Sequence, residues 1–177
     1  MKYQIKATGT QKGQKLRFSA LFLCFAIFFS ACSRGRSDLL KYKDVPFTST
    51  VSVSGGRIDF EAIFSISAPD GVGERNFSAE FLAPESLKGL VVSQVGGEAK
   101  IALGDKEFLS AESEILRLLD IGKIAQMLAP DGAVRSIKSE GGLTAVTVGA
   151  ITLYIDPVSA FPVRITDRAS GIIVFIK

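Results

Sequence analysis

The sequence predicts an α+β fold that is mainly antiparallel β: a curled meander sheet with one main amphipathic helix inserted mid-chain. Three observations predict it. Apolar and polar residues alternate with a period of two through most of the chain after residue 47, as in strands with one buried face. Glycine pairs and Asp-Pro steps interrupt this alternation at short intervals, as turns do. Between residues 110 and 128 the apolar spacing changes to that of a helix.

The first 31 residues have the features of an export signal. Residues 1–17 carry five basic side chains and no acid, and the uncharged run from Phe18 to Ala31 is too short to span about 30 Å of hydrocarbon. Small residues precede Cys32, and this stretch resembles the bacterial lipobox. We therefore expect residues 1–31 to be a lipoprotein signal peptide and Cys32 to be lipidated. The alternative is an ordinary secretory signal or an uncleaved anchor in which Cys32 is incidental.

Lipidation would make a membrane the first partner of this chain. Each buried CH2 of an acyl chain contributes about 0.8 kcal/mol, so several chains hold a protein on the bilayer. We expect the protein to be anchored to the cell membrane or outer membrane, facing the extracytoplasmic side. Removal of the signal changes the net charge from +3 to about −2. Because no cluster of Lys and Arg then remains for a phosphate backbone, a nucleic-acid partner is not expected.

The mature chain is expected to contain a tether and one domain. Residues 32–46 are the lipidated cysteine and a polar tether, with ordered structure beginning between Leu39 and Phe47. Residues 47–177 form a single β-rich domain, in which Gly55-Gly56 is a predicted hairpin turn. The first strands are predicted at residues 51–53, 58–66, 77–83, 90–95 and 99–103.

The predicted helix follows Leu109. Ser110 can cap its N-terminus, and Glu112 lies near the positive end of the helix dipole. Apolar residues from Ile115 to Leu128 form one stripe, with a kink expected at Gly122. The remaining strands, which bring the total to about ten, are predicted at residues 133–138, 143–148, 151–155, 163–166 and 172–176.

A sheet of this size has a large apolar face, and one helix covers only part of it. The sheet must therefore curl, and the uncovered part of its apolar face is a candidate cavity.

The order of these elements resembles the half-barrel family of LolA- and LolB-like lipoprotein carriers and receptors. Two phrases carry the resemblance besides the cysteine: Phe81–Leu87 after a strand, and Leu153–Ile165, in which a strand ends in Asp, turns and restarts at a proline. The family opens with a long amphipathic helix, whereas residues 39–47 are too short for one. The resemblance implies a half-barrel whose concave face holds the acyl chains of a lipid or an acylated protein.

The resemblance also implies which residues contact the ligand, namely those of the inward strand face and the helix stripe. The alternative is that they are only core, packed with no space for a ligand. These residues are Phe60, Phe64, Ile66, Phe77, Phe81, Ile115, Leu119 and Ile124.

Catalysis, a metal site and a cofactor are not expected. The chain has no histidine, which excludes Ser-His-Asp and Cys-His nucleophilic sites and His-bearing zinc sites. Asp59 and Glu61 share one strand face, but it is opposite Phe60, so we interpret them as solvated. Residues 70–74 lack the number of ligands of a calcium loop.

Two functions therefore remain as predictions. The first is an envelope lipoprotein that binds a lipid or acylated ligand on the concave face of the sheet. The second is a structural or accessory envelope lipoprotein with a closed core that binds another protein. A cavity on the concave side distinguishes the two.

Overall fold

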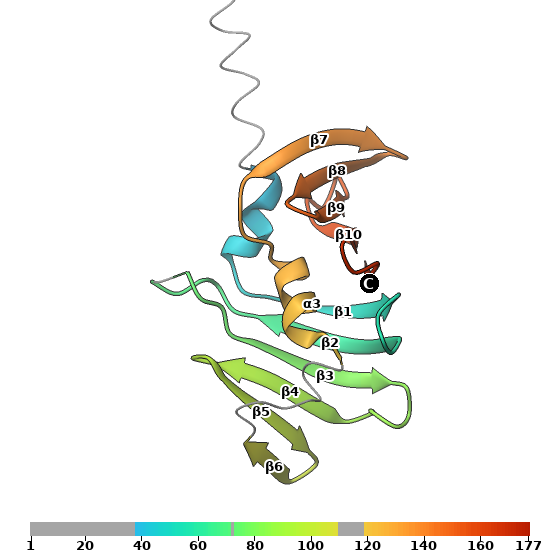
Figure 1. Ribbon diagram of the computed structural model, residues 1–177. Coiled ribbons are helices and arrows are strands. Elements are labelled where there is room, and N and C mark those ends of the chain that lie inside the picture. The colour runs from blue at the N-terminus through green and yellow to red at the C-terminus, as the bar shows by residue number, and fades with distance from the viewer. Residues whose placement is uncertain (1–37, 72, 110–118) are drawn as a thin grey trace, which may run out of the picture. The chain divides into compact units, whose positions relative to one another are not determined.

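Eleven strands form one open antiparallel sheet in the computed structural model, which describes residues 38–71, 73–109 and 119–177. Across the sheet the strands follow the order β6-β5-β4-β3-β2-β1-β11-β10-β9-β8-β7 (Figure 1). Their bounds are β1 (Phe47–Ser54), β2 (Phe60–Ile66), β3 (Phe77–Ala83), β4 (Leu90–Val95), β5 (Glu98–Leu103), β6 (Lys106–Leu109), β7 (Val134–Glu140), β8 (Leu143–Val148), β9 (Ile151–Ile155), β10 (Pro162–Asp167) and β11 (Ile173–Ile176).

Two meanders meet at the centre of this sheet. Strands β1 to β6 pair in succession, as do β7 to β11, and β11 returns to pair with β1. The register of this central pair places Val53 opposite Val174, and both side chains are buried. The first and last strands of the domain thus hold its two halves in one sheet.

Alternating burial gives the sheet an inner apolar face. In β2, Phe60, Ala62, Phe64 and Ile66 are buried, whereas the three residues between them are half-buried. Residues on the inward face of the other strands join them in a single core. The period of two predicted from the sequence is therefore confirmed, and so is the predominance of antiparallel strands.

The turn after β1 depends on glycine. Gly55 has a φ of 77°, in the left-handed region that favours glycine. A Cβ atom at this position would lie 2.4 Å from the carbonyl oxygen of Gly171 in the neighbouring turn. The predicted Gly55-Gly56 turn thus joins β1 to β2 and also allows the turn before β11 to approach closely.

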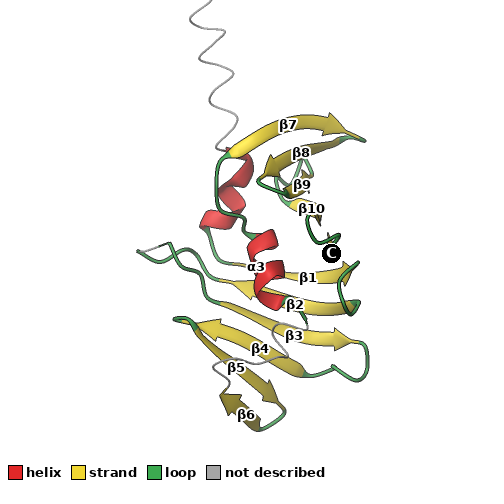
Figure 2. Cartoon of the chain, viewed as in Figure 1, coloured by secondary structure: helices red, strands yellow, loops and turns green. Residues whose placement is uncertain are grey.

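Two helices of the described residues pack into the same core (Figure 2). The 3-10 helix η1 (Asp38–Asp44) contributes Leu40. Helix α3 (Ile121–Leu128) lies in the connection between β6 and β7, the two edges of the sheet. A connection between opposite edges must cross one face of the sheet, and the apolar stripe of α3 selects the inner face. Its buried residues are Ile121, Ile124, Ala125, Met127 and Leu128.

Among the described residues the helix α3 begins at Ile121 and contains Gly122. Asp120, which precedes it, has a φ of 51° in the left-handed region, which a right-handed helix does not contain. The predicted cap Ser110 and the stripe residue Ile115 lie outside the described residues.

The remaining differences concern short segments. β6 was not predicted, because its four residues follow a turn directly and are too few to show a period. β1 begins at Phe47, four residues before the predicted start at Val51. The apolar alternation does not show this first half, because residues 48–50 all carry hydroxyl side chains. Residues 38–44, assigned to the tether, form η1, because Leu40 adds apolar surface that the core buries.

An ion pair attaches α3 to the sheet. The Nζ atom of Lys123 lies 2.8 Å from Oδ2 of Asp167 at the end of β10. The hydroxyl of Ser170 and the backbone N–H of Ala169 also donate to this carboxylate. Burial by itself raises the pKa of Asp167, but these contacts outweigh burial and lower it from 3.8 to about 2.

Candidate ligand pocket

The predicted ligand residues that the structure describes all lie in one buried core. None of them is more than 8% exposed, and Phe64, Phe81 and Ile124 are fully buried. The rings of Phe60 and Phe81 pack with their centroids 4.9 Å apart. Ile115, like the predicted lipidation site Cys32, lies outside the described residues. Where these residues meet, sheet and helix pack directly against each other.

A pocket of about 380 Å³ opens at one end of this core, between α3 and the ends of β2, β3 and β4. This volume is toward the low end of the roughly 300–1,000 Å³ of ligand sites. Two of the predicted residues, Ile66 and Phe77, contribute to its wall. The other apolar or small wall residues include Gly122, Ala125 and Ala129, and the polar ones include Glu74, Arg75, Asn76, Gln94, Gln126 and Asp131.

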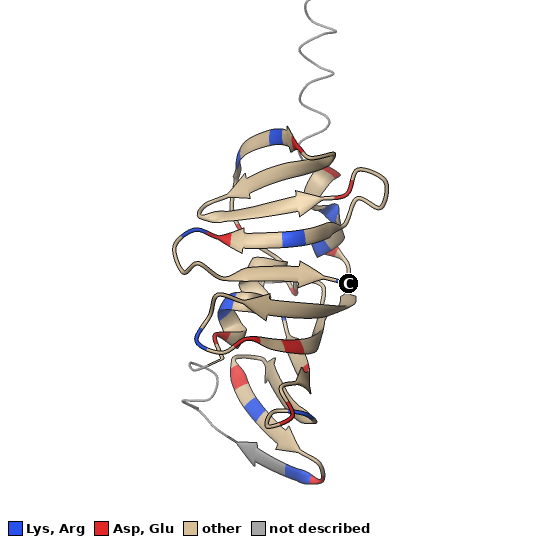
Figure 3. Cartoon of the chain, turned by 90° about the vertical axis from the view of Figure 1, so that its right-hand side faces the viewer, with Lys and Arg blue, Asp and Glu red and all other residues tan. Residues whose placement is uncertain are grey.

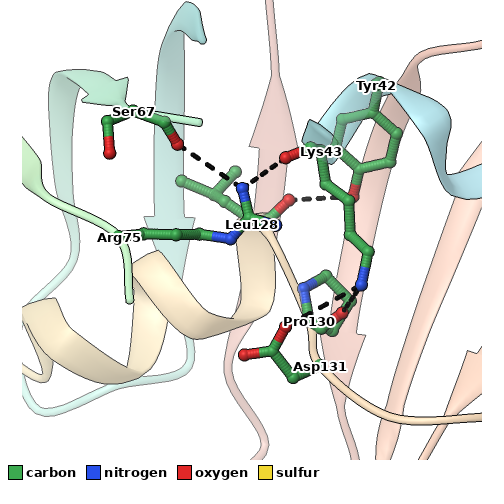
Figure 4. A network of polar contacts seen from close by, with 7 residues as sticks. All are labelled: Tyr42, Lys43, Ser67, Arg75, Leu128, Pro130 and Asp131. Carbon is green, nitrogen blue, oxygen red and sulfur yellow. Dashed lines mark hydrogen bonds and ion pairs between the residues drawn. The ribbon is translucent and has the colours of Figure 1, made fainter. Parts of the chain in front are cut away.

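Arg75 connects the pocket to η1. It stands between the turn that follows β2 and the start of β3, and its Nη1 atom donates to the carbonyl oxygens of Lys43 and Ser67 (Figure 4). Its Nε atom is buried and has no hydrogen-bond partner among the described residues. One edge of this guanidinium is therefore engaged in the fold, while Nε still lacks an acceptor.

Two side chains of η1 hold the end of α3. The hydroxyl of Tyr42 donates to the carbonyl oxygen of Leu128 over 2.8 Å, and Nζ of Lys43 donates to that of Pro130 over 2.7 Å (Figure 4). The same ammonium lies 3.8 Å from a carboxylate oxygen of Asp131. These contacts satisfy carbonyls that the helix end leaves without intrahelical partners. Burial raises the pKa of Tyr42, and the charge of Arg75 partly opposes that effect.

Sequence reasoning found part of the pocket wall and missed the polar part. Ile66 and Phe77 were predicted because they belong to an alternating apolar face. Arg75, Gln94 and Gln126 were not predicted, since a polar residue near a turn or on a helix is most often solvated. Their convergence depends on the way three separate segments pack at one end of the sheet.

Another hollow, of about 410 Å³, is a shallow groove over the outer face of β1 to β4. Its floor includes the row Thr48, Ser65, Ser78 and Ser93, which are paired across the four strands. This row faces away from the apolar core, but Ile66, Asn76 and Phe77 line both the groove and the pocket, so the two hollows adjoin at this end of the sheet.

In the part of the chain that the structure describes, no group of three or more His, Cys, Asp or Glu side chains is placed to hold a metal ion. No helix there has the length and apolarity needed to cross a bilayer.

Solved structures similar to this chain include an uncharacterized conserved protein from Thermus thermophilus, with a TM-score of 0.46 and 18% identity over 79% of this chain and 80% of that one. A LolA superfamily protein is also among the structures similar to this chain. This protein, from Nitrosomonas europaea, has a TM-score of 0.43 and 13% identity over 80% and 90% of the two chains. The lipoprotein LppX from Mycobacterium tuberculosis has a TM-score of 0.42 and 13% identity over 83% and 92%.

The resemblance predicted from the sequence is confirmed to the extent that a LolA superfamily protein and a lipoprotein are among these structural neighbours. No protein-family model matches the chain, and no curated protein matches it in sequence.

Proposed function

We propose that this chain is the precursor of a lipid-anchored envelope protein that binds one acylated ligand, a lipid or an acylated protein, in the pocket beside α3. The single observation that carries the proposal is the pocket of about 380 Å³ on the inner face of the sheet. Its wall combines apolar side chains with polar ones, which is the composition of a site for a ligand that has both an apolar and a polar part.

The polar part of the wall indicates how such a ligand would lie. Arg75, Gln94 and Gln126 bring side chains with hydrogen-bond donors to this wall. An ester, amide or phosphate oxygen of the ligand would accept from them. The apolar chain would then lie against Ile66, Phe77 and Ala125.

A role in binding rather than catalysis is part of this proposal. The chain has no histidine, and the polar residues of the pocket wall are three amides, an arginine and the carboxylates of Glu74 and Asp131. Amides and arginine bind acceptors and donors but are poor general bases, and Asp131 lies beside the ammonium of Lys43. The second candidate, an accessory protein with a closed core, is favoured by the full burial of Phe64, Phe81 and Ile124.

Filling the pocket from Gly122 tests the proposal. This residue lines the pocket, and a Cβ atom added to it meets nothing within 4 Å. We expect Gly122→Leu to occupy the site and to remove bound lipid while the protein stays folded. The measurement is native mass spectrometry of residues 33–177, expressed without the anchor, followed by solvent extraction.

Gly122→Ala is the matched control, because it makes the same change from glycine to a good helix former and adds only a methyl group. We expect this variant to retain the lipid of the parent protein. A parent protein that carries no acyl-chain adduct would contradict the ligand proposal and favour the closed-core alternative.

The anchor has its own test. We expect Cys32→Ser to abolish acylation and to leave the protein soluble or with its signal uncleaved, because only the cysteine thiol accepts the lipid. Membrane fractionation and the mass of the mature N-terminus measure this. Unchanged membrane attachment at unchanged mass would contradict the assignment, and Ser33→Ala is the control that should retain acylation.

A further inference from the structure

Two exposed valines lie beside η1. Val158, in the turn between β9 and β10, is 92% exposed, and Val45, which follows η1, is 55% exposed. Phe161 joins their segments, since its ring centroid lies 5.1 Å from that of Tyr42 and 5.6 Å from that of Phe47. The β9–β10 turn and the junction of η1 with β1 therefore lie side by side, joined by contacts between their aromatic rings.

The β9–β10 turn is held in one conformation by Asp156. Its carboxylate accepts hydrogen bonds from the backbone N–H of Val158 and the hydroxyl of Ser159, at 3.0 and 3.1 Å. These hydrogen bonds lower the pKa of Asp156. Backbone hydrogen bonds also join Asp156 to Ala160 and Phe161. These contacts satisfy backbone N–H donors of the turn, so those groups need no water when the apolar tip at Val158 enters a less polar environment, while the charged Asp156 stays in solvent.

The chain before η1 limits how far the surface beside it can lie from a membrane. Asp38 is the first residue of η1, and the predicted lipidation site is Cys32. At 3.3–3.6 Å per residue, the segment between them spans at most about 20 Å. An acylated Cys32 therefore keeps η1, and the surface beside it, close to the bilayer.

The charges near η1 are mixed in sign. The helix itself carries Lys41 and Lys43 together with Asp38 and Asp44. Over the sheet, too, basic and acidic residues are interspersed rather than gathered in a patch of one sign (Figure 3). Attraction to anionic lipid is therefore weak, and the apolar side chains are left as the source of affinity.

We propose that Val158 and Val45 enter the interface of the bilayer as a second membrane contact, supported from within the domain by the packed rings of Tyr42, Phe47 and Phe161. The inference rests on the anchor in the proposed function. Because Arg75 of the pocket wall bonds to the backbone of Lys43 in η1, this contact orients the domain so that the pocket lies near the head groups.

The test uses the complete lipidated protein in phosphatidylcholine vesicles. Val158→Cys is labelled with the environment-sensitive fluorophore NBD. The labelling is selective for this position, because Cys24 is removed with the signal and the thiol of Cys32 carries the lipid. We expect the label to emit at a shorter wavelength than in buffer and to be quenched by spin-labelled lipid. The quenching should persist at about 1 M salt, because charges are then screened beyond about 3 Å while apolar contacts remain. Leu103→Cys is the control: its side chain, at the end of β5, is 53% exposed, and we expect several-fold less quenching.

A second variant keeps the inference falsifiable without a label on Val158. Val158→Asp, at a fully solvated position, leaves the fold intact, and we expect it to lower the quenching of a label on Val45→Cys several-fold. Equal emission and quenching at positions 158 and 103, in protein that sediments with the vesicles, would overturn this membrane contact and leave the anchor standing. Protein that carries no acyl group and does not sediment with them would overturn the anchor and this inference together.

Discussion

Asp167 shows how a single side chain combines burial with charge. It is 4% exposed, and it keeps its charge because an ammonium, a hydroxyl and a backbone N–H surround it. A folded-state pKa of about 2 lies below the ordinary value of 3.8, so ionisation of this group stabilises the folded state at any pH above 3.8. This ionisation contributes on the order of 2 kcal/mol to the free energy of unfolding. Solvent screening at the partly exposed Lys123 reduces that contribution.

Asp167→Asn should therefore change both the stability and its dependence on pH. We expect a loss of about 1–2 kcal/mol at neutral pH, because the amide cannot pair with Lys123. The difference between the two proteins should shrink as the pH falls from about 4 to about 2, where the parent carboxylate becomes protonated. Urea unfolding at several pH values measures this, and a difference that stays constant down to pH 2 would contradict the assignment.

At the scale of elements, η1 and α3 hold each other in place at the edge of the pocket. Tyr42 and Lys43 bond to carbonyl oxygens at and just beyond the end of α3, and Arg75 bonds to the backbone of η1. Neither helix is long enough to be stable alone, since isolated helices shorter than about 12–15 residues are marginal in water. Their position therefore depends on these bonds and on the apolar side chains they bury.

Tyr42→Phe measures one of these bonds. We expect a loss of about 1 kcal/mol of unfolding free energy, because the carbonyl of Leu128 loses its donor while the ring stays packed against Phe47 and Phe161. Tyr154→Phe is the matched control, since the ring of Tyr154 stacks under Arg164 and its hydroxyl makes no hydrogen bond among the described residues. Equal effects of the two substitutions in denaturant unfolding would contradict this role of Tyr42.

At the scale of the whole domain, the pair β1–β11 joins two meanders that are otherwise consecutive along the chain. β11 is bonded on both sides, to β1 and to β10, so its loss would open the sheet at its centre. The inner face of both halves would then be exposed, including Val53 and Ile165, which are buried in the complete sheet.

Removal of residues 172–177 should therefore unfold the domain rather than shorten it. We expect loss of the cooperative thermal transition and rapid proteolysis, because the two halves bury their apolar faces only together. Phe175→Ser is the control: this side chain faces outward from β11 and is 45% exposed, so we expect a nearly unchanged melting temperature. A truncated protein that melts cooperatively would contradict the central role of β11.

The sequence by itself determined the type of most elements and the face that each strand buries, because both are written in the local spacing of apolar residues. The alternation of Phe60, Phe64 and Ile66 predicts a strand and its inward face without reference to any partner. The tertiary structure decided what depends on packing between distant segments: the pairing of β1 with β11 and the position of Arg75 beside the pocket. A period identifies an apolar face but not its neighbour, and a pocket is the space that remains only after all neighbours have packed.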